Sequence, residues 1–198
     1  MKRLTIAVDV DDVLLPNFQA LVGWHNRTYG TSLVLADNGS EDLTRWGADS
    51  PEEAIRRVQV FFDSDEFKAI RPFEDARRAL AQLNERYDLM VLTARDTIIE
   101  ATTREWISEH FADLFREVHF TAKYSLEGKR RQKADVLRET KASYLIDDAL
   151  ENIIPATDVG IRGLLYGDYP WNQTNSLSGG VTRVKDWAAV LQYFDEQG

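Results

Sequence analysis

Cysteine is absent from this chain of 198 residues. Its absence excludes disulfide bonds, thiolate metal sites and cysteine nucleophiles, and it fits a reducing compartment. No apolar run approaches the roughly 20 residues that a membrane-spanning helix needs. The first such run, Leu4 to Val8, stops at Asp9 and is too short for the apolar core of a signal peptide. We therefore expect a cytoplasmic protein with no membrane partner.

Positively charged residues are fewer than negatively charged ones. The chain has 24 Lys and Arg against 33 Asp and Glu, which gives a formal net charge of −9 and a pI near 4.9. A field of this sign repels phosphate backbones, so long nucleic acids are poor partners. Apolar residues make up 43% and charged residues 29%, which is ordinary for a globular protein. The length favours one domain, with room for an insertion.

Short β-rich runs recur along the chain. They cover residues 4–8, 89–92, 118–120, 144–146 and 163–166. Helical patterns cover residues 74–86, 97–110 and 133–140, and no clear helical pattern separates the last two runs. Nearly continuous hydrophobicity is typical of parallel strands that are covered on both faces. The alternation predicts an α/β fold with a Rossmann-like open parallel sheet flanked by helices.

Nearly eighty residues separate the first strand from the second, far more than a crossover requires, and most of them look helical. Pro16 suits the first turn of one helix, and Ser50-Pro51-Glu52-Glu53 has the form of a capping box that begins another. We therefore expect a small helical cap subdomain over residues 16–72, inserted into a core formed by residues 1–15 and 73–198.

Carboxylates follow two of the expected strands. Asp9, Asp11 and Asp12 come directly after the first, and Asp147 with Asp148 after the fourth. Open α/β sheets bind ligands at the carboxyl ends of their strands, where both groups belong. Carboxylates held close together need a cation or a proton to offset their repulsion, and an oxygen-rich site suits Mg²⁺. For each group alone, turn and capping chemistry is the alternative explanation.

A third strand ends in Leu92-Thr93-Ala94-Arg95, which offers a hydroxyl, backbone N–H groups and a guanidinium. Such groups recognise phosphate oxygens. Lys133 opens the helix before the fourth strand, so its ammonium group could reach the same edge. Alone, Thr93 is more often a strand-end residue, and a single lysine is usually a solvated charge. The ordered set of acidic pair, hydroxyl, lysine and acidic pair is hard to produce by capping preferences alone.

The ordered set resembles the motifs of the haloacid dehalogenase (HAD) superfamily of phosphotransferases. The first motif is matched by Asp9-Val10-Asp11-Asp12-Val13, the second by Thr93, the third by Lys133 and the fourth by Asp147-Asp148. The chain departs from the family pattern at Asp12, where glycine is common. Lys123 could also take the role of Lys133.

A cap between the first and second motifs looks most like the 5'(3')-deoxyribonucleotidase branch of that superfamily. Leu145-Ile146-Asp147-Asp148 and the later Tyr169-Pro170-Trp171-Asn172 add to this likeness. The resemblance implies a Mg²⁺-dependent phosphomonoesterase, a 5'-nucleotidase acting on (deoxy)nucleoside monophosphates. Its partner would be a small phosphomonoester substrate.

The resemblance also implies a role for each residue. Asp9 would attack phosphorus to give an aspartyl-phosphate, and Asp11 would protonate the leaving alkoxide and then deprotonate water. Asp9, the Asp11 main-chain carbonyl and Asp148 would hold Mg²⁺, with Asp147 as an outer acceptor. Thr93 and Lys133 are the other catalytic candidates. The phosphate oxygens would be held by Thr93, Ala94, Arg95 and Lys133.

Two other functions stay open. One is the same chemistry on another small metabolite, such as a sugar phosphate. The other is a phospho-ligand binding protein without turnover, which the intact pair of Asp9 and Asp11 disfavours. The sequence fixes neither the base, the sugar nor the phosphate position, and a homodimer is one of several open oligomeric states. Aromatic residues of the cap could stack on a base, but helical spacing favours a role in the cap's own core for Phe61 and Phe62.

The three histidines, His25, His110 and His119, are scattered and show no metal-ligand spacing, so we assign them no metal role.

Overall fold

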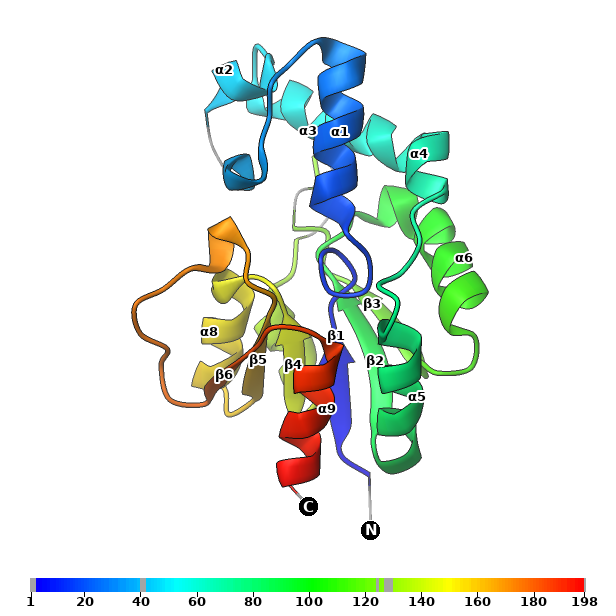
Figure 1. Ribbon diagram of the computed structural model, residues 1–198, viewed down its shortest axis with the longest axis vertical. Helices are drawn as coiled ribbons and strands as arrows, with labels where there is room; N and C mark the ends of the chain where they lie inside the picture. Colours follow the sequence, from blue (N-terminus) through cyan, green and yellow to red (C-terminus); the bar gives the residue numbers. More distant parts are fainter. Residues whose placement is uncertain (1–2, 40–41, 124, 127–129, 198) are drawn as a thin grey trace.

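The centre of the molecule is a parallel β-sheet (Figure 1). The computed structural model describes residues 3–39, 42–123, 125–126 and 130–197. Its strands are β1 (Thr5–Val8), β2 (Asp88–Thr93), β3 (Glu117–Phe120), β4 (Tyr144–Asp147), β5 (Arg162–Tyr166) and β6 (Val181–Val184). They lie in the order β3-β2-β1-β4-β5-β6, and every neighbouring pair is parallel. The predicted α/β fold with an open parallel sheet is confirmed.

Helices cover both faces of this sheet. One layer contains α5 (Ala76–Arg86), α6 (Glu100–Phe111) and α9 (Trp187–Glu196), and the other contains α7 (Lys133–Thr140) and α8 (Leu150–Asp158). The side chains of β1 alternate between the two cores. Ile6 and Val8 pack with the first layer, and Ala7 packs with the second.

The sequence patterns do not predict β6, α8 and α9. Helix α8 contains Pro155 within only nine residues, and an internal proline is typical of a helix end rather than of a helix. Ile153 of α8 is nevertheless fully buried. A Cβ at Gly163 of β5 would lie 2.7 Å from a methyl carbon of Ile153, so the missing side chain lets the helix approach the strand.

The strand order places the end of β1 at the centre of the sheet. The chain proceeds from β1 to β2 on one side and later returns to β4 on the other, so Val8 pairs with both Val91 and Ile146. Such a reversal leaves a crevice beyond the carboxyl ends of the strands. The residues after β1, β2 and β4 therefore meet at one edge.

A helical insertion follows β1 and lies beyond the carboxyl ends of the strands (Figure 1). It consists of α1 (Asn17–Tyr29), the short 3₁₀ turn η1 (Leu35–Asp37), α2 (Leu43–Trp46), α3 (Pro51–Asp63) and α4 (Asp65–Lys68). The Ser50 hydroxyl accepts a hydrogen bond from the Glu53 N–H at 3.2 Å, as the predicted cap of α3 requires.

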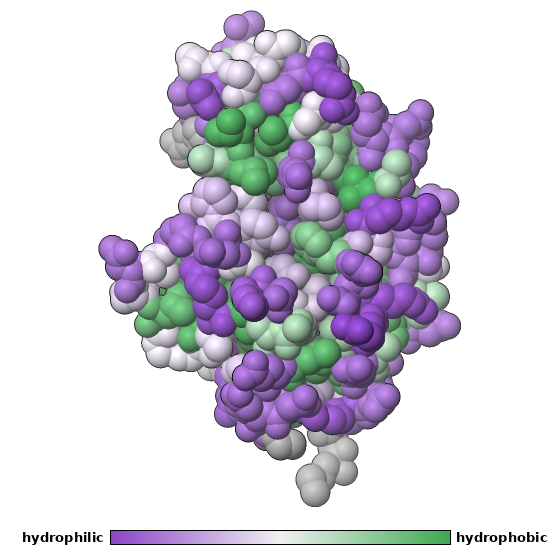
Figure 2. All heavy atoms as spheres, in the orientation of Figure 1, coloured by the Kyte–Doolittle hydropathy of each residue, from purple (hydrophilic) through white to green (hydrophobic). Residues whose placement is uncertain are grey.

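Aromatic side chains form the interior of this insertion. The rings of Phe61, Phe62 and Phe67 pack against one another with centroids 4.9 to 5.7 Å apart, and all three residues are buried. The burial of Phe61 and Phe62 matches the apolar core that the helical spacing predicts. On the face drawn in Figure 2, hydrophobic surface gathers on the part of the insertion nearest the sheet, whereas hydrophilic surface covers most of the lower part. Within the described residues, none of the helices has both the length and the hydropathy of a membrane-spanning segment.

His25 is fully buried in the insertion, so it does not face an open site. Its Nδ1 atom lies 2.8 Å from the Thr31 hydroxyl, and Nε2 has no partner within the described part of the chain. Burial, followed by the nearby Arg57 guanidinium, lowers the pKa of His25 to about 4. The neutral imidazole therefore belongs to the folded state.

This burial predicts a loss of stability in mild acid. Because the folded pKa is lowered from 6.5 to about 4, the unfolded state binds more protons between these values. The free energy of unfolding should fall as the pH drops through this window, by at most about 3 kcal/mol. Urea unfolding at pH 7 and pH 4.5 should show a smaller drop for His25→Gln than for the wild type. The edge-strand variant His119→Gln should keep the wild-type drop, and an equal drop in all three proteins would contradict the argument.

Candidate active site

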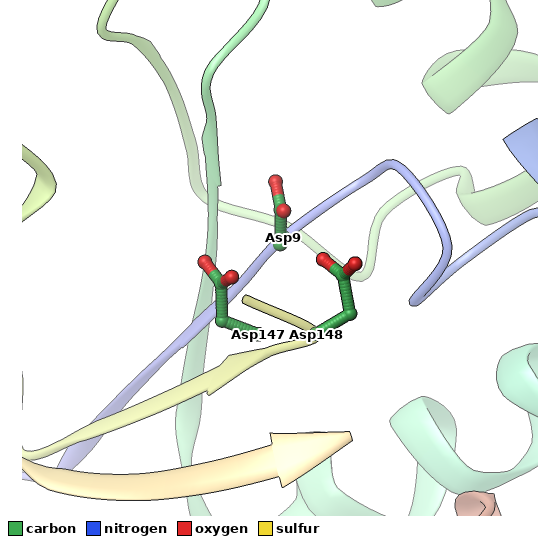
Figure 3. Close-up of side chains that lie close together, drawn as sticks. All are labelled: Asp9, Asp147 and Asp148. Atoms are coloured by element: carbon green, nitrogen blue, oxygen red, sulfur yellow. The ribbon is translucent and has the colours of Figure 1, made fainter. Parts of the chain in front are cut away.

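Three carboxylates converge at the carboxyl edge of the sheet. Asp9 follows β1 directly, Asp147 ends β4, and Asp148 is the next residue. The Asp9 N–H donates to the Ile146 carbonyl at 2.9 Å, so the chain keeps its strand register up to this position. One oxygen of each carboxylate lies within 4.8 Å of the other two, and all three residues are buried (Figure 3). The structure thus brings together the two acidic groups that lie far apart in sequence.

Lys133 contacts two of these carboxylates. Its Nζ atom is 2.8 Å from Asp9 Oδ1 and 2.6 Å from Asp147 Oδ2. Helix α7 begins at this residue, and its apolar face packs on the sheet, so the first side chain reaches the strand ends. Lys123 has an ion pair with Glu151 instead, and its side chain is 32% exposed. The lysine that contacts the acidic cluster is therefore Lys133.

Negative charge exceeds positive charge in this cluster. Burial raises the pKa of Asp9 to about 7, while Lys133 lowers it and Asp147 raises it. Burial, followed by Asp147 and Asp9, raises the pKa of Asp148 well above its usual range. Burial favours the neutral amine of Lys133, but the two carboxylates outweigh it and raise its pKa above the usual range. The cluster contains three acidic side chains and one ammonium group, which contacts two of them, so a further cation would reduce the repulsion among the carboxylates.

Asp147 is held by its own surroundings. Its Oδ1 atom accepts hydrogen bonds from the Ala149 N–H and the Asn152 side-chain amide, each at 3.0 Å. Its Oδ2 atom accepts from Lys133 at 2.6 Å. Because both of its oxygens already accept hydrogen bonds, the Asp147 carboxylate is better suited to orient Lys133 than to bind a metal ion directly. Asn152 is a residue that the sequence did not single out, and nothing in its spacing signals this contact.

Asp9 and Asp148 each have one carboxylate oxygen that accepts no hydrogen bond within the described residues. Asp9 Oδ1 accepts from the Val10 N–H at 2.8 Å and contacts Lys133, and Asp148 Oδ2 accepts from the Trp171 indole N–H at 2.6 Å. Within the described residues, Asp9 Oδ2 and Asp148 Oδ1 receive no hydrogen bond. Two open carboxylate oxygens in a buried cluster with excess negative charge fit a hard divalent cation such as Mg²⁺.

Asp11 lies beside this cluster and is paired with Arg95. Arg95 Nε is 3.0 Å from Asp11 Oδ2, and Arg95 Nη2 is 2.7 Å from Asp11 Oδ1. The Thr93 hydroxyl is buried and accepts from the Arg95 N–H at 3.2 Å. The Ala94 carbonyl accepts from the Lys123 N–H at 3.1 Å, which ties the end of β2 to the segment after β3. Binding of phosphate by Thr93, Ala94 and Arg95 stays a prediction.

Asp12 has a left-handed backbone, with φ of +58°. Glycine adopts this conformation without strain, and aspartate is among the few other residues that adopt it. Its carboxylate accepts from the Phe18 N–H at 3.1 Å, and its carbonyl accepts from the Tyr169 hydroxyl at 2.7 Å. Burial, followed by Asp11, raises the pKa of Asp12 to about 8.

The 3₁₀ turn η3 (Pro170–Asn172) supports the acidic pair. Trp171 donates to Asp148 and stacks on Tyr169 with ring centroids 4.5 Å apart. The Asn172 side-chain amide donates to the Asp148 carbonyl at 3.0 Å. The sequence pointed to this segment only as a likeness, and its contacts with Asp148 follow from the structure.

A small crevice of about 70 Å³ lies beside this turn. Its walls come from both the core and the insertion, and they include Asp12, Pro16, Gln19, Leu35, Phe73, Tyr169 and Trp171.

The sheet order, the insertion after β1 and the acidic strand ends are features of the HAD-like fold. Solved structures share this fold: the haloacid dehalogenase-like hydrolase SP0104 from Streptococcus pneumoniae has a TM-score of 0.70 at 16% identity, over 97% of this chain and 98% of that one. YfnB from Bacillus subtilis, solved bound to magnesium, has a TM-score of 0.67 at 11% identity, over 98% and 100%.

The family model "5' nucleotidase, deoxy (Pyrimidine), cytosolic type C protein" (NT5C) matches residues 3–195, and the chain belongs to this family. Among curated proteins, YqfW of Bacillus subtilis is 22% identical, over 97% of this chain and 94% of that protein. BH1399 of Halalkalibacterium halodurans is 18% identical, over 98% and 94%. Both carry the name of a candidate nucleotidase.

Proposed function

We propose that the protein is a Mg²⁺-dependent phosphomonoesterase that dephosphorylates (deoxy)nucleoside monophosphates through an aspartyl-phosphate. One observation carries the proposal: Asp9 and Asp148 keep open oxygens in a buried, negatively charged cluster around Lys133. Membership in the NT5C family supports the nucleotide substrate. The family description as a cytosolic protein supports a cytoplasmic location, which we also propose.

The proposed role of each aspartate follows from which of its carboxylate oxygens already accept hydrogen bonds. Asp9 Oδ2 would attack phosphorus, while Lys133 holds Oδ1 and so fixes the direction of attack. Mg²⁺ would be held by the open oxygen of Asp148, by the Asp11 main-chain carbonyl and by the Asp9 carboxylate through the oxygen that does not attack phosphorus. The bound ion would offset the repulsion between an anionic nucleophile and an anionic phosphate. Asp147 would keep Lys133 in place.

Asp11 is the proposed general acid and base. Its side chain is 24% exposed, so the carboxylate is accessible to a substrate. It would protonate the leaving alkoxide and then take a proton from the water that hydrolyses the aspartyl-phosphate. Thr93 and Lys133 would hold phosphate oxygens.

We also propose that residues 16–72 act as a cap on a core of residues 1–15 and 73–198. The insertion has its own aromatic interior and lies beyond the strand ends (Figure 1). The crevice lined from both parts supports this division. A cap in this place would exclude water and select the leaving group.

A substrate panel tests the function. With Mg²⁺ present, the protein should hydrolyse dUMP or dTMP faster than sugar phosphates, and EDTA should abolish the reaction. Equal or faster turnover of sugar phosphates would assign the same chemistry to another metabolite. Binding of nucleotide without hydrolysis of any panel member, p-nitrophenyl phosphate included, would contradict the enzyme.

Metal binding can be tested without turnover. Mg²⁺ at about 100 times its dissociation constant should raise the free energy of unfolding by about 2.7 kcal/mol. Asp148→Asn removes the charge of one proposed ligand and should lose most of this gain. The matched control is Asp168→Asn, an exposed residue whose carboxylate accepts from Gln173. The metal assignment fails if Mg²⁺ stabilises all three proteins equally or none of them.

A further inference from the structure

Each of the three side-chain nitrogens of Arg95 donates to a protein acceptor. Nε and Nη2 contact the two oxygens of Asp11, and Nη1 donates to the Thr103 hydroxyl at 3.1 Å. These contacts engage three of the five N–H groups of the guanidinium and hold it against Asp11 and Thr103. The contact with Asp11 is two-pronged, and such a contact fixes the plane of a carboxylate as well as its position.

The Arg95 guanidinium also packs against aromatic rings of the helical insertion. Its central carbon lies 5.0 Å from the ring centre of Phe62 in α3 and 4.9 Å from that of Phe67 in α4. Cations are attracted to the faces of aromatic rings at these distances. Only 1% of the Arg95 side chain is exposed, so its position is set by these neighbours. A shift of α3 and α4 would therefore displace the guanidinium, and with it Asp11.

We infer that Arg95 is a positioning residue for Asp11, and that it couples the orientation of this carboxylate to the packing of α3 and α4. The inference rests on the proposed function, in which Asp11 protonates the leaving alkoxide. Proton delivery requires a fixed angle between the carboxyl group and the leaving oxygen. The insertion would thus control the protonation step through a buried arginine that need not touch the substrate.

Two substrates whose leaving groups differ in their need for a proton can distinguish a positioning role of Arg95 from phosphate binding and from a purely structural role. The alkoxide of a nucleoside must be protonated as it leaves, whereas p-nitrophenolate leaves without help. Arg95→Lys keeps the positive charge and loses the two-pronged contact. Its kcat/KM for dUMP should fall by about 10²-fold with KM within about threefold of the wild type, and its kcat/KM for p-nitrophenyl phosphate should change by about threefold or less. The ratio kcat/KM is the measure because hydrolysis of the aspartyl-phosphate, which also uses Asp11 and is common to both substrates, contributes to kcat alone.

Phe67→Leu gives the same readout without altering the ion pair. It should lower kcat/KM for dUMP more than kcat/KM for p-nitrophenyl phosphate, by a smaller factor than Arg95→Lys, and the two effects should not be additive in the double variant. The control is Arg104→Lys in α6, where an exposed arginine pairs with Glu100 and lies over the Phe120 ring. It should leave both reactions unchanged.

Three results would overturn the inference. A rise in KM for both substrates would mean that Arg95 binds the phosphate, as the sequence suggested. An equal loss of kcat/KM for both substrates, with a lower melting temperature, would mean a structural role alone. Absence of wild-type turnover on either substrate would overturn the proposed function, and this inference with it.

Discussion

Replacement of Asp9 by asparagine is expected to abolish turnover and to leave the metal-free protein at least as stable as the wild type. An amide oxygen cannot form the acyl-phosphate bond, so kcat should fall by about 10⁴-fold or more. The amide can still accept the hydrogen bonds from the Val10 N–H and Lys133 that the carboxylate now accepts. The fold should therefore persist.

The expected gain in stability follows from the raised pKa of Asp9. Burial raises this pKa from 3.8 to about 7, so the folded state holds the proton more tightly than the unfolded state. Above pH 7 the carboxylate is ionised in both states, and its buried charge lowers the free energy of unfolding. As the pH falls through 7, the wild type recovers this stability. At pH 8 without metal, Asp9→Asn should be more stable by roughly 1 to 4 kcal/mol.

Urea unfolding in EDTA at pH 8 and pH 6, together with kcat, measures both effects. The stability difference between Asp9→Asn and the wild type should shrink at pH 6. Asp168→Asn, in an exposed position, should match the wild type in turnover and stability. A variant that keeps more than about 1% of wild-type turnover would exclude Asp9 as the nucleophile. A large loss of stability would contradict the electrostatic argument.

The acidic strand ends were predictable because the geometry of parallel sheets is general. Strands that run in one direction end at one edge, so Asp9 and Asp147 had to approach each other once both strands were recognised. The place of Lys133 followed from the helix that it begins. Helix α8 was not predicted because Pro155 interrupts its helical sequence pattern. The helix forms nevertheless, because Ile153 is buried against the sheet.

The contacts of Arg95 could not be predicted from spacing. A guanidinium at a strand end can turn toward a phosphate or toward a neighbouring carboxylate, and local sequence does not distinguish these choices. Here Phe62 and Phe67, about thirty residues earlier in the chain, fill the space around it. The same holds for Trp171 and Asp148, whose contact depends on how the turn η3 packs over the sheet. Contacts between distant elements decide the finer parts of the site.

Removal of the Lys133 charge is expected to have the largest effect on stability. Lys133→Met keeps the length of the side chain but leaves Asp9 and Asp147 buried without their cation. Loss of one partner of a buried ion pair typically costs 3 to 5 kcal/mol, so we expect a loss of about 4 kcal/mol in metal-free buffer. The kcat should also fall by about 10² to 10³-fold because the phosphate loses a fixed positive charge.

Lys123→Met is the matched control. Lys123 and Glu151 form a partly exposed ion pair, and such pairs contribute about 1 kcal/mol or less. Both urea unfolding and kcat should therefore stay close to the wild type. If Lys123→Met loses turnover while Lys133→Met keeps it, the phosphate-binding lysine is the other one.

The double variant Asp9→Asn with Lys133→Met separates charge from packing. If the loss in Lys133→Met arises from unpaired carboxylates, removal of the Asp9 charge should restore part of the free energy of unfolding, because only Asp147 then lacks its cation. A loss caused by packing alone would persist unchanged in the double variant. Restoration of stability without restoration of turnover would show that Lys133 stabilises the same negative charge on which the proposed catalysis depends.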